Sequence, residues 1–181
     1  MNYIALFEGL NPHFFEKEYI RSLPAEESFV EQILLLNQFS PDAVDIPCPE
    51  HITFGLLEGS IEELHKAVAQ VDEDWVQYFG EGSPVFCAFD GQKIAAFCTM
   101  DDWGTHQGLR VSGPGCVGTV PAYRKQGIGL KMVQLATAYL KQQGFDLSYI
   151  HYTYLESWYA RLGYETIIRW NCQGIQWVRE K

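Results

Sequence analysis

One segment near the middle of the chain limits the possible folds more than any other. Residues 128–143 predict an amphipathic helix that ends at Gly144. Its apolar side is formed by Ile128, Met132, Leu135, Ala136 and Tyr139, and its polar side by Lys131, Gln134 and Lys141. Residues 116–120 before the helix and 147–152 after it are typical of short buried strands. A strand, a helix and a second strand in this order indicate an α/β domain.

The rest of the chain extends this pattern on both sides. Towards the C-terminus we expect a short helix around residues 154–162 and paired strands over 164–171 and 173–179. Towards the N-terminus we expect a strand over 51–59, a helix starting at Ser60, and a hairpin of residues 83–90 and 93–100 around Asp90-Gly91.

The first 50 residues have a different pattern. Residues 11–40 predict helix, because apolar residues recur there at helical spacing and Pro41 follows; these residues are Phe29, Val30, Ile33, Leu34 and Leu36. The sequence therefore predicts an N-terminal helical extension over residues 1–50 and a mixed-sheet α/β domain over residues 51–181.

Composition excludes several classes of protein. With 181 residues, 47% of them hydrophobic and 20% charged, the chain is typical of one globular domain. No apolar run approaches the length of a membrane-spanning helix, and the N-terminus resembles no secretory signal. Five cysteines at wide spacings favour free thiols in a reducing compartment. We therefore expect a cytoplasmic protein, a monomer or homodimer, with no membrane partner.

Charge and ligand patterns exclude two further kinds of partner. The net charge of −10 argues against nucleic acid, and no spacing of Cys or His typical of a zinc site occurs, so we expect no metal. The charge is unevenly divided: residues 1–90 carry a net −14 and residues 91–181 a net +4. This division indicates either two ligands of opposite charge or a surface that is acidic for solubility.

The segment between residues 119 and 129 has the composition of an anion site. Gly127 and Gly129 allow close approach of the backbone, the helix that follows offers unpaired amides, and Arg124 and Lys125 add positive charge. These features favour a pyrophosphate cradle, and an ordinary glycine-rich turn between strand and helix is the alternative.

The same segment resembles the acyl-CoA signature of the GNAT superfamily of N-acyltransferases, R/Q-x-x-G-x-G/A. Arg124, Gly127 and Gly129 supply the pattern, and Pro121 and Tyr123 are similar to the V-x-P-x-Y-R that precedes it in many members. Thr119 departs from the valine of that pattern. Further on, residues 159–164 (YARLGY) resemble the family's Y-E-K-L-G-F. The resemblance covers about 130 residues and implies a GNAT-like fold over 51–181.

The resemblance also implies a set of residues that bind acetyl-CoA. The backbone amides of residues 126–129 would hold the pyrophosphate, and the pantetheine arm would lie between splayed strands around 116–120 and 147–152. An amide of Thr119 or Val120 would polarise the thioester carbonyl, and Thr153 stands where the family often has a pantetheine-contacting asparagine. The implied acetyl-CoA site consists of Thr119, Val120, Arg124, Lys125, Gln126, Gly127, Ile128, Gly129 and Thr153.

Catalytic roles follow in the same way. Tyr159 matches the tyrosine that in many members protonates the departing CoA thiolate, and packing at a helix end is the other interpretation. The strand 116–120 contains no carboxylate, so the candidate bases on the acceptor side are His151 and the pair Asp101-Asp102. Cys116 as an acyl-accepting nucleophile is less favoured, because no partner base lies beside it in the sequence.

The sequence therefore predicts an N-acetyltransferase that moves an acetyl group from acetyl-CoA to a primary amine by direct attack. Trp75, Tyr78 and Trp103, together with acidic residues, would line the mouth opposite the CoA and favour a cationic amine. The alternative is a catalytically silent CoA-binding module, whose role is regulation or partner binding, on the same fold.

Overall fold

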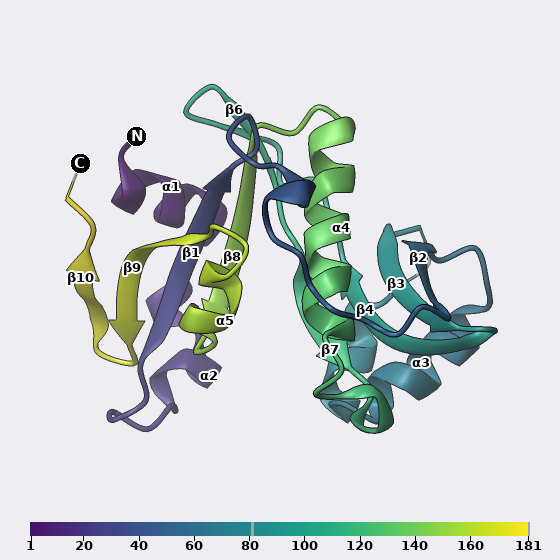
Figure 1. The fold of residues 1–181 in the computed structure, drawn as a ribbon. Coiled ribbons are helices and arrows are strands. Elements are labelled where there is room, and N and C mark those ends of the chain that lie inside the picture. Colours follow the sequence, from purple (N-terminus) through teal and green to yellow (C-terminus); the bar gives the residue numbers. More distant parts are fainter. Residues whose placement is uncertain (81, 181) are drawn as a thin grey trace.

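Two β-sheets pack against one central helix, α4 (Figure 1). The computed structural model describes residues 1–80 and 82–180. One sheet has the strand order β10-β9-β1-β8-β6-β5, and the other has the order β2-β3-β4-β7. The helices are α1 (Tyr3–Leu10), α2 (Glu18–Arg21), α3 (Ile61–Ala69), α4 (Ile128–Gln142) and α5 (Glu156–Ala160). The strands are β1 (Phe29–Leu35), β2 (Ile52–Leu56), β3 (Val85–Asp90), β4 (Lys93–Thr99), β5 (Thr105–His106), β6 (Leu109–Ser112), β7 (Gly115–Thr119), β8 (Leu147–Thr153), β9 (Glu165–Asn171) and β10 (Gly174–Val178).

The two sheets meet where β6 continues into β7. Strand β6 pairs in parallel with β8, with Val111 opposite Leu147 and Ser112 opposite Ser148. After the two intervening residues, 113 and 114, the chain belongs to the other sheet, because β7 pairs antiparallel with β4. No pairing joins β7 to β8 in the described residues, and Figure 1 shows the two strands diverging below β6. The divergence leaves the facing edges of β7 and β8 without a neighbouring strand.

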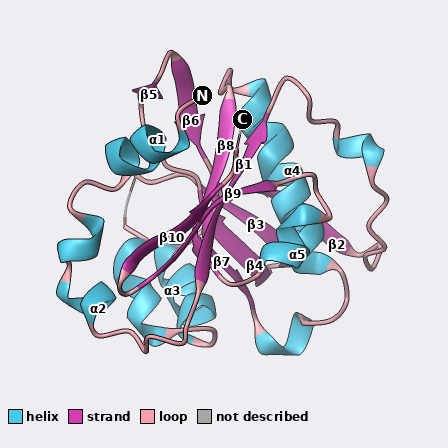
Figure 2. Ribbon diagram, turned by 90° about the vertical axis from the view of Figure 1, so that its left-hand side faces the viewer, coloured by secondary structure: helices cyan, strands magenta, loops and turns pink. Residues whose placement is uncertain are grey.

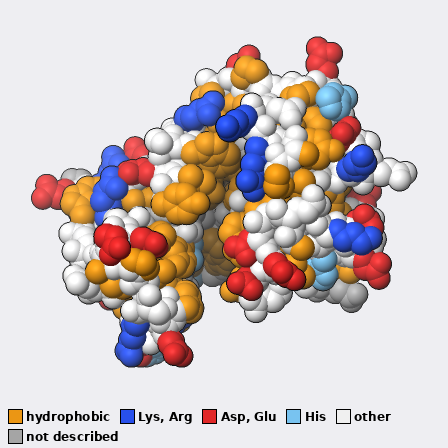
Figure 3. All heavy atoms as spheres, turned by 90° about the horizontal axis from the view of Figure 1, so that it is seen from below, with side chains coloured by type: hydrophobic (Ala, Val, Ile, Leu, Met, Phe, Trp, Pro, Cys, Tyr) orange, Lys and Arg blue, Asp and Glu red, His pale blue; other side chains and the backbone are white. Residues whose placement is uncertain are grey.

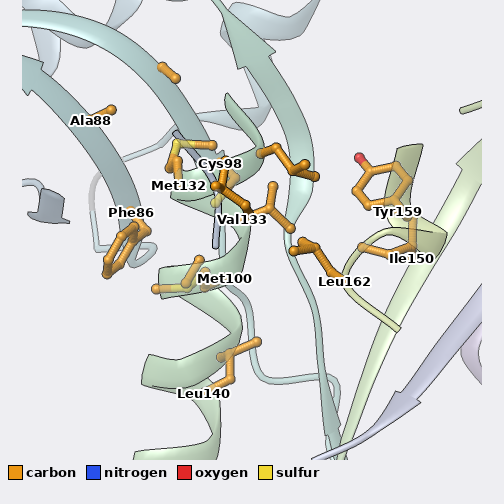
Figure 4. Close-up of a cluster of buried hydrophobic side chains, with 14 of the residues drawn as sticks. Phe86, Ala88, Cys98, Met100, Met132, Val133, Leu140, Ile150, Tyr159 and Leu162 are labelled. Carbon is orange, nitrogen blue, oxygen red and sulfur yellow. The ribbon is translucent and has the colours of Figure 1, made fainter. Parts of the chain in front are cut away.

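Three apolar clusters hold these layers together. Helix α4 packs on both sheets at once, and Figure 4 shows Met132 and Val133 beside Phe86 and Cys98 of the four-stranded sheet. A second cluster packs α3 on the other face of that sheet. The third packs α1, α2 and the short 3-10 helix Phe14–Glu16 on the face of the six-stranded sheet opposite α5 (Figure 2).

The helix predicted over residues 11–40 is wrong for residues 29–35, which form strand β1 in the middle of the six-stranded sheet. Strand β1 pairs antiparallel with β8 on one side and with β9 on the other. Both of its faces are buried, so apolar residues occur on both and the alternation that identifies a half-exposed strand is missing. The boundary between residues 50 and 51 stays a prediction, and the sheet takes strands from both sides of it.

The other predicted elements are confirmed, including the hairpin β3–β4, the two C-terminal strands and helix α4. One side chain of α4 differs from expectation. Gln134, predicted to face water, is buried and donates hydrogen bonds to the carbonyl oxygens of Pro41 and Val44, each at 2.7 Å. Lys141 donates to the Phe39 carbonyl in the same way. Both contacts fix the connector between β1 and β2 on the outside of α4.

The position of β1 gives a stability test. Replacing Ile33 by alanine removes a buried side chain from the sheet and should lower the free energy of unfolding by about 2–5 kcal/mol. Replacing Ile4, which is 41% exposed on α1, is the matched control and should change it by less than about 0.5 kcal/mol. Denaturant unfolding measures both values. A loss below about 1 kcal/mol for Ile33→Ala would show that β1 is peripheral.

Candidate active site

A cleft of about 1440 Å³ lies between the diverging strands β7 and β8. The first turn of α4, the segment before it, and α5 complete its walls. Figure 3 shows the hollow between the two halves of the molecule, with hydrophobic side chains inside and acidic side chains both beside its opening and on the outer surface. Its lining includes the cations Arg124, Lys125 and Arg161, and no described lining residue is Asp or Glu. The cleft therefore suits a ligand that is both anionic and partly apolar.

The segment before α4 forms a cradle of backbone amides at one end of this cleft. Lys125 and Gly127 both have left-handed backbone conformations, with φ of 60° and 80°. Helix α4 begins after Gly127 without a side-chain cap, and within residues 1–80 and 82–180 we find no hydrogen bond donated by an amide of residues 125–130. Free amides at a helix N-terminus bind phosphate oxygens well, because the helix dipole adds to their positive charge.

The two glycines of the motif are required by the protein's own packing. A Cβ on Gly127 would lie 2.0 Å from the carbonyl oxygen of Pro47, and one on Gly129 would lie 2.3 Å from Oγ1 of Thr119. We expected the missing side chains to leave space for a ligand, but protein atoms occupy this space. The glycines therefore let α4 approach β7 and the connector, which places the free amides at the cleft.

Of the two backbone amides predicted to polarise the thioester carbonyl, those of Thr119 and Val120, only the first is free to do so. The Val120 amide donates to the Ala95 carbonyl at 3.0 Å, Val120 is buried, and it does not line the cleft, so its predicted role is wrong. In an antiparallel ladder the next residue points its amide and carbonyl to the opposite side. Thr119 pairs with Ala96 in this register, so its amide faces away from β4. Thr119 also lines the cleft.

Tyr159 lines the same cleft from α5. Its ring is 4% exposed and packs against Trp158 and Tyr164. Burial raises the pKa of its hydroxyl, so that the group keeps its proton at neutral pH. In Figure 4 the hydroxyl points away from Ile150 and Leu162. The predicted pantetheine contact, Thr153, also lines the cleft, where its Oγ1 accepts a hydrogen bond from the Leu155 amide at 3.0 Å.

His151 lies in the cleft, and the two aspartates proposed with it do not. His151 lines the cleft from β8, and its Nδ1 is 2.9 Å from Oε2 of Glu31. Neither Asp101 nor Asp102 lines it. Asp102 binds Arg110 at 2.7 Å and accepts a hydrogen bond from the Gly104 amide, and both contacts lower the pKa of its carboxyl. Sequence reasoning missed Glu31, because it placed this residue on an external helix.

Cys116 is also brought into the cleft, on a bulge of β7 where its φ is 45°. Burial, together with the charges of Asp101 and Asp72, raises the pKa of its thiol to about 11. A thiol that stays protonated is a poor nucleophile, which favours direct transfer over an acyl-cysteine route.

The structure brings the predicted aromatic residues into the cleft but no described carboxylate, and their place opposite the CoA stays a prediction. Trp75, Tyr78 and Trp103 line the cleft, but the described carboxylates do not. Within residues 1–80 and 82–180 there is no cluster of three His, Cys, Asp or Glu side chains able to hold a metal ion. In the same residues, no helix has the length and apolar character needed to cross a membrane.

The contact between Gly129 and Thr119 gives a test of how the cradle is held. Gly129→Ala should lower the free energy of unfolding, because its Cβ would overlap Oγ1 of Thr119. In a Thr119→Ala background the overlap is gone, so Gly129→Ala should become neutral or stabilise by up to about 1 kcal/mol, as expected for alanine in a helix. The test is a double-mutant cycle by denaturant unfolding. Equal effects of Gly129→Ala in both backgrounds would contradict this packing.

Comparison with known proteins agrees with this architecture. A family profile for the acetyltransferase (GNAT) domain matches residues 81–166. Among solved structures, the chain is similar to a GCN5-related glucosamine N-acetyltransferase region in a fungal multi-domain GH3 β-N-acetylglucosaminidase, with a TM-score of 0.68 and 21% identity over 80% of this chain and 20% of that one. It is also similar to a GCN5-related N-acetyltransferase from Kribbella flavida, with a TM-score of 0.53 and 18% identity over 78% of this chain and 55% of that one.

A third similar structure is a tandem GNAT protein from the clavulanic acid biosynthesis pathway, with a TM-score of 0.56 and 14% identity over 80% of this chain and 51% of that one. The chain thus spans about a fifth of the first protein and about half of the other two. Identities this low show the fold alone. A search of curated proteins gives no significant match. The family profile over residues 81–166, the fold and the arrangement of the cleft together show that the chain contains a GNAT domain.

Proposed function

We propose that this protein transfers an acetyl group from acetyl-CoA to a primary amine. The GNAT domain supports acyl transfer in general. The observation that carries the more specific proposal is the cleft between β7 and β8. It combines free amides and cations at one end, a buried phenol beside it, and a lining without described carboxylates.

The residues of the cleft fit a CoA thioester. The amides of residues 126–129 and the side chains of Arg124 and Lys125 would bind the pyrophosphate, since helix N-termini and cations both favour phosphate. The unpaired edges of β7 and β8 would bind the amide groups of the pantetheine arm. Arg161, which also lines the cleft, is a further cation available to the phosphates.

The transfer step needs two proton movements. The amine nitrogen attacks the thioester carbonyl carbon, a C–N bond forms, and the C–S bond breaks. The amide of Thr119 would donate a hydrogen bond to the carbonyl oxygen as negative charge develops there. Tyr159 would donate its proton to the departing CoA thiolate and recover one from solvent. Much of the rate would come from holding both substrates in contact.

The acceptor is proposed to be a cationic amine. Without carboxylates in the lining, this part of the proposal rests on Trp75, Tyr78 and Trp103, whose ring faces can contribute cation–π attraction of about 0.5–2 kcal/mol. A cytoplasmic location and a monomeric or homodimeric state stay predictions. The free cysteines in the described residues agree with a reducing compartment.

Binding of the acyl donor can be tested through Lys125. Lys125→Ala should weaken acetyl-CoA binding by about 1 kcal/mol or more, which is at least about fivefold in Kd, because a charge-assisted contact to phosphate is lost. Lys93→Ala is the matched control, since Lys93 is exposed at the β3–β4 hairpin and does not line the cleft. Isothermal titration calorimetry measures both, and equal affinities in the two variants would place the phosphates elsewhere.

The role of Tyr159 separates catalysis from packing. Tyr159→Phe keeps the ring and should lower kcat by about 10²–10⁴-fold with little change in acetyl-CoA affinity. Tyr164→Phe is the matched control. The Tyr164 hydroxyl is buried in hydrogen bonds with Thr137 and Ser148, so its loss should reduce stability by about 1–3 kcal/mol and leave kcat unchanged. If kcat of Tyr159→Phe stays within about twofold of the wild type, Tyr159 has a packing role only.

The function as a whole is tested by a CoA-release screen with acetyl-CoA and a panel of amines. The panel contains polyamines, aminoglycosides, amino acids, peptide N-termini and glucosamine, which appears in the description of one similar structure. Turnover of at least one amine is the expected result. Thermal stabilisation by CoA without thiol release on any amine would instead identify a CoA-binding module without catalysis.

A further inference from the structure

Glu31 is a fully buried carboxylate that three hydrogen-bond donors surround. Its oxygens accept from Nδ1 of His151 at 2.9 Å, from Nε1 of Trp170 at 2.7 Å and from the Tyr152 amide at 3.2 Å. A buried carboxylate is costly unless donors compensate its charge. This set supplies only donors, which is the environment that an ionised carboxylate needs.

The backbone is irregular at Glu31, and the irregularity brings the donors together. Between Val30 and Gln32 the pairing of β1 with β8 shifts, so that His151 and Tyr152 of β8 both lie opposite Glu31. Tyr152 has a φ of 52° at this bulge. The pairing of β1 with β9 also shifts directly after Glu31. Bulges of this kind redirect side chains, and here the bulge lets one carboxylate bind both the ring of His151 and the next amide.

The contact with Glu31 leaves the other ring nitrogen of His151 available. An ionised carboxylate accepts hydrogen bonds and donates none, so Nδ1 of neutral His151 carries the proton and Nε2 keeps its lone pair. The side chain of His151 is 29% exposed and lines the cleft. No hydrogen bond to Nε2 is found among the described residues.

A second cavity, of about 370 Å³, adjoins His151 and contains none of the cradle residues in its lining. It is bounded by the C-terminal end of α1, Trp103, Tyr149 and His151, and both Trp103 and His151 also line the main cleft. Tyr149 is fully buried, and its hydroxyl, which lies near Glu31 and Asn11, makes no hydrogen bond of standard geometry within the described residues. A polar group that is buried without a partner can be satisfied by a bound ligand. His151 therefore stands where the cleft for the acyl donor meets a separate cavity of a size for a small molecule or side chain.

We propose that His151, positioned by Glu31, accepts the proton that the acceptor amine loses, and that the acceptor enters from this second cavity. The inference rests on the proposed function. The ammonium form of the amine gives one proton to Nε2 of His151, the imidazolium is stabilised by Glu31, and the neutral nitrogen then attacks. The second proton, which the nitrogen loses as the C–N bond forms, passes to solvent. The proton on His151 then leaves to solvent through the cleft, while Tyr159 protonates the CoA sulfur. His151 is the catalytic residue of the pair, and Glu31 is a positioning residue.

The titratable groups around His151 come from several elements. They are Tyr149 and Tyr152 on β8, His106 on β5 across the second cavity, Cys116 on β7 and Tyr159 on α5 across the main cleft, and Glu31 on β1. Burial raises the pKa of both Tyr149 and Tyr152, and the charge of Glu31 raises that of Tyr149 further. These hydroxyls stay neutral in the assay range, so Glu31 is the carboxylate that acts directly on His151.

The test compares two variants with the amine that turns over fastest in the screen. His151→Gln keeps a donor for Glu31 and removes the basic nitrogen, so kcat should fall about 10²–10⁴-fold with an unchanged Kd for acetyl-CoA. The ratio of the wild-type kcat to that of His151→Gln should become smaller as pH rises, because a larger fraction of the amine is then already neutral. Glu31→Gln should lower kcat about tenfold or more, because the imidazole ring of His151 is then no longer held in the tautomer with the proton on Nδ1. In His151→Ala, added imidazole should restore part of the rate.

If Glu31→Gln fails to fold, a second measurement on the wild-type protein, which needs no acceptor amine, still tests the inference. The ¹⁵N chemical shifts of the wild-type imidazole should show His151 protonated on Nδ1 in its neutral form. The opposite tautomer, or a kcat for His151→Gln within about twofold of the wild type at every pH, would overturn the inference. Failure of the wild type to acetylate any amine would instead overturn the proposed function, so the two failures are distinguishable.

Discussion

A strand can share each of its edges with only one neighbour, and the segment from residue 109 to residue 119 changes neighbours halfway along. Its first part, β6, pairs with β8, and its second part, β7, pairs with β4. The facing edges of β7 and β8 are therefore left with unpaired amides and carbonyls, which need a partner wherever they are buried. The cleft and the accessible Thr119 amide result from this one change, and the two glycines of the cradle place its free amides at the same opening. An extended, amide-containing ligand is the natural partner for such edges.

The N-terminal segment is part of the site. Strand β1 fills the space between β8 and β9 and brings Glu31 behind His151, and the end of α1 forms one wall of the second cavity. The anion-binding features come from residues after 115, while the support for His151 comes from residues before 36. The charge difference between the two halves of the sequence therefore does not describe the cleft, whose described lining is cationic and aromatic.

Local patterns predicted much of the fold, because α4, the β3–β4 hairpin and the C-terminal strands each carry their own turn or capping residues. Strand β1 could not be identified in this way. Its apolar residues cover both faces, and their spacing also fits a helix. The cradle was identified from Arg124, Gly127 and Gly129, but the reason for the glycines depends on Pro47 and Thr119, which only the folded chain brings near. The sequence could not show that the Val120 amide is unavailable to the thioester, because its hydrogen bond to the Ala95 carbonyl forms only in the folded sheet.

The central claim is that the opening between β7 and β8 is the acyl-CoA site, and its backbone amides report on it directly. Amide hydrogen exchange followed by NMR, with and without acetyl-CoA, measures protection at each residue. The account predicts slower exchange at Thr119 and at residues 126–129 when acetyl-CoA is bound, with β9 and β10 unchanged. Binding of acetyl-CoA without added protection at these amides would contradict it.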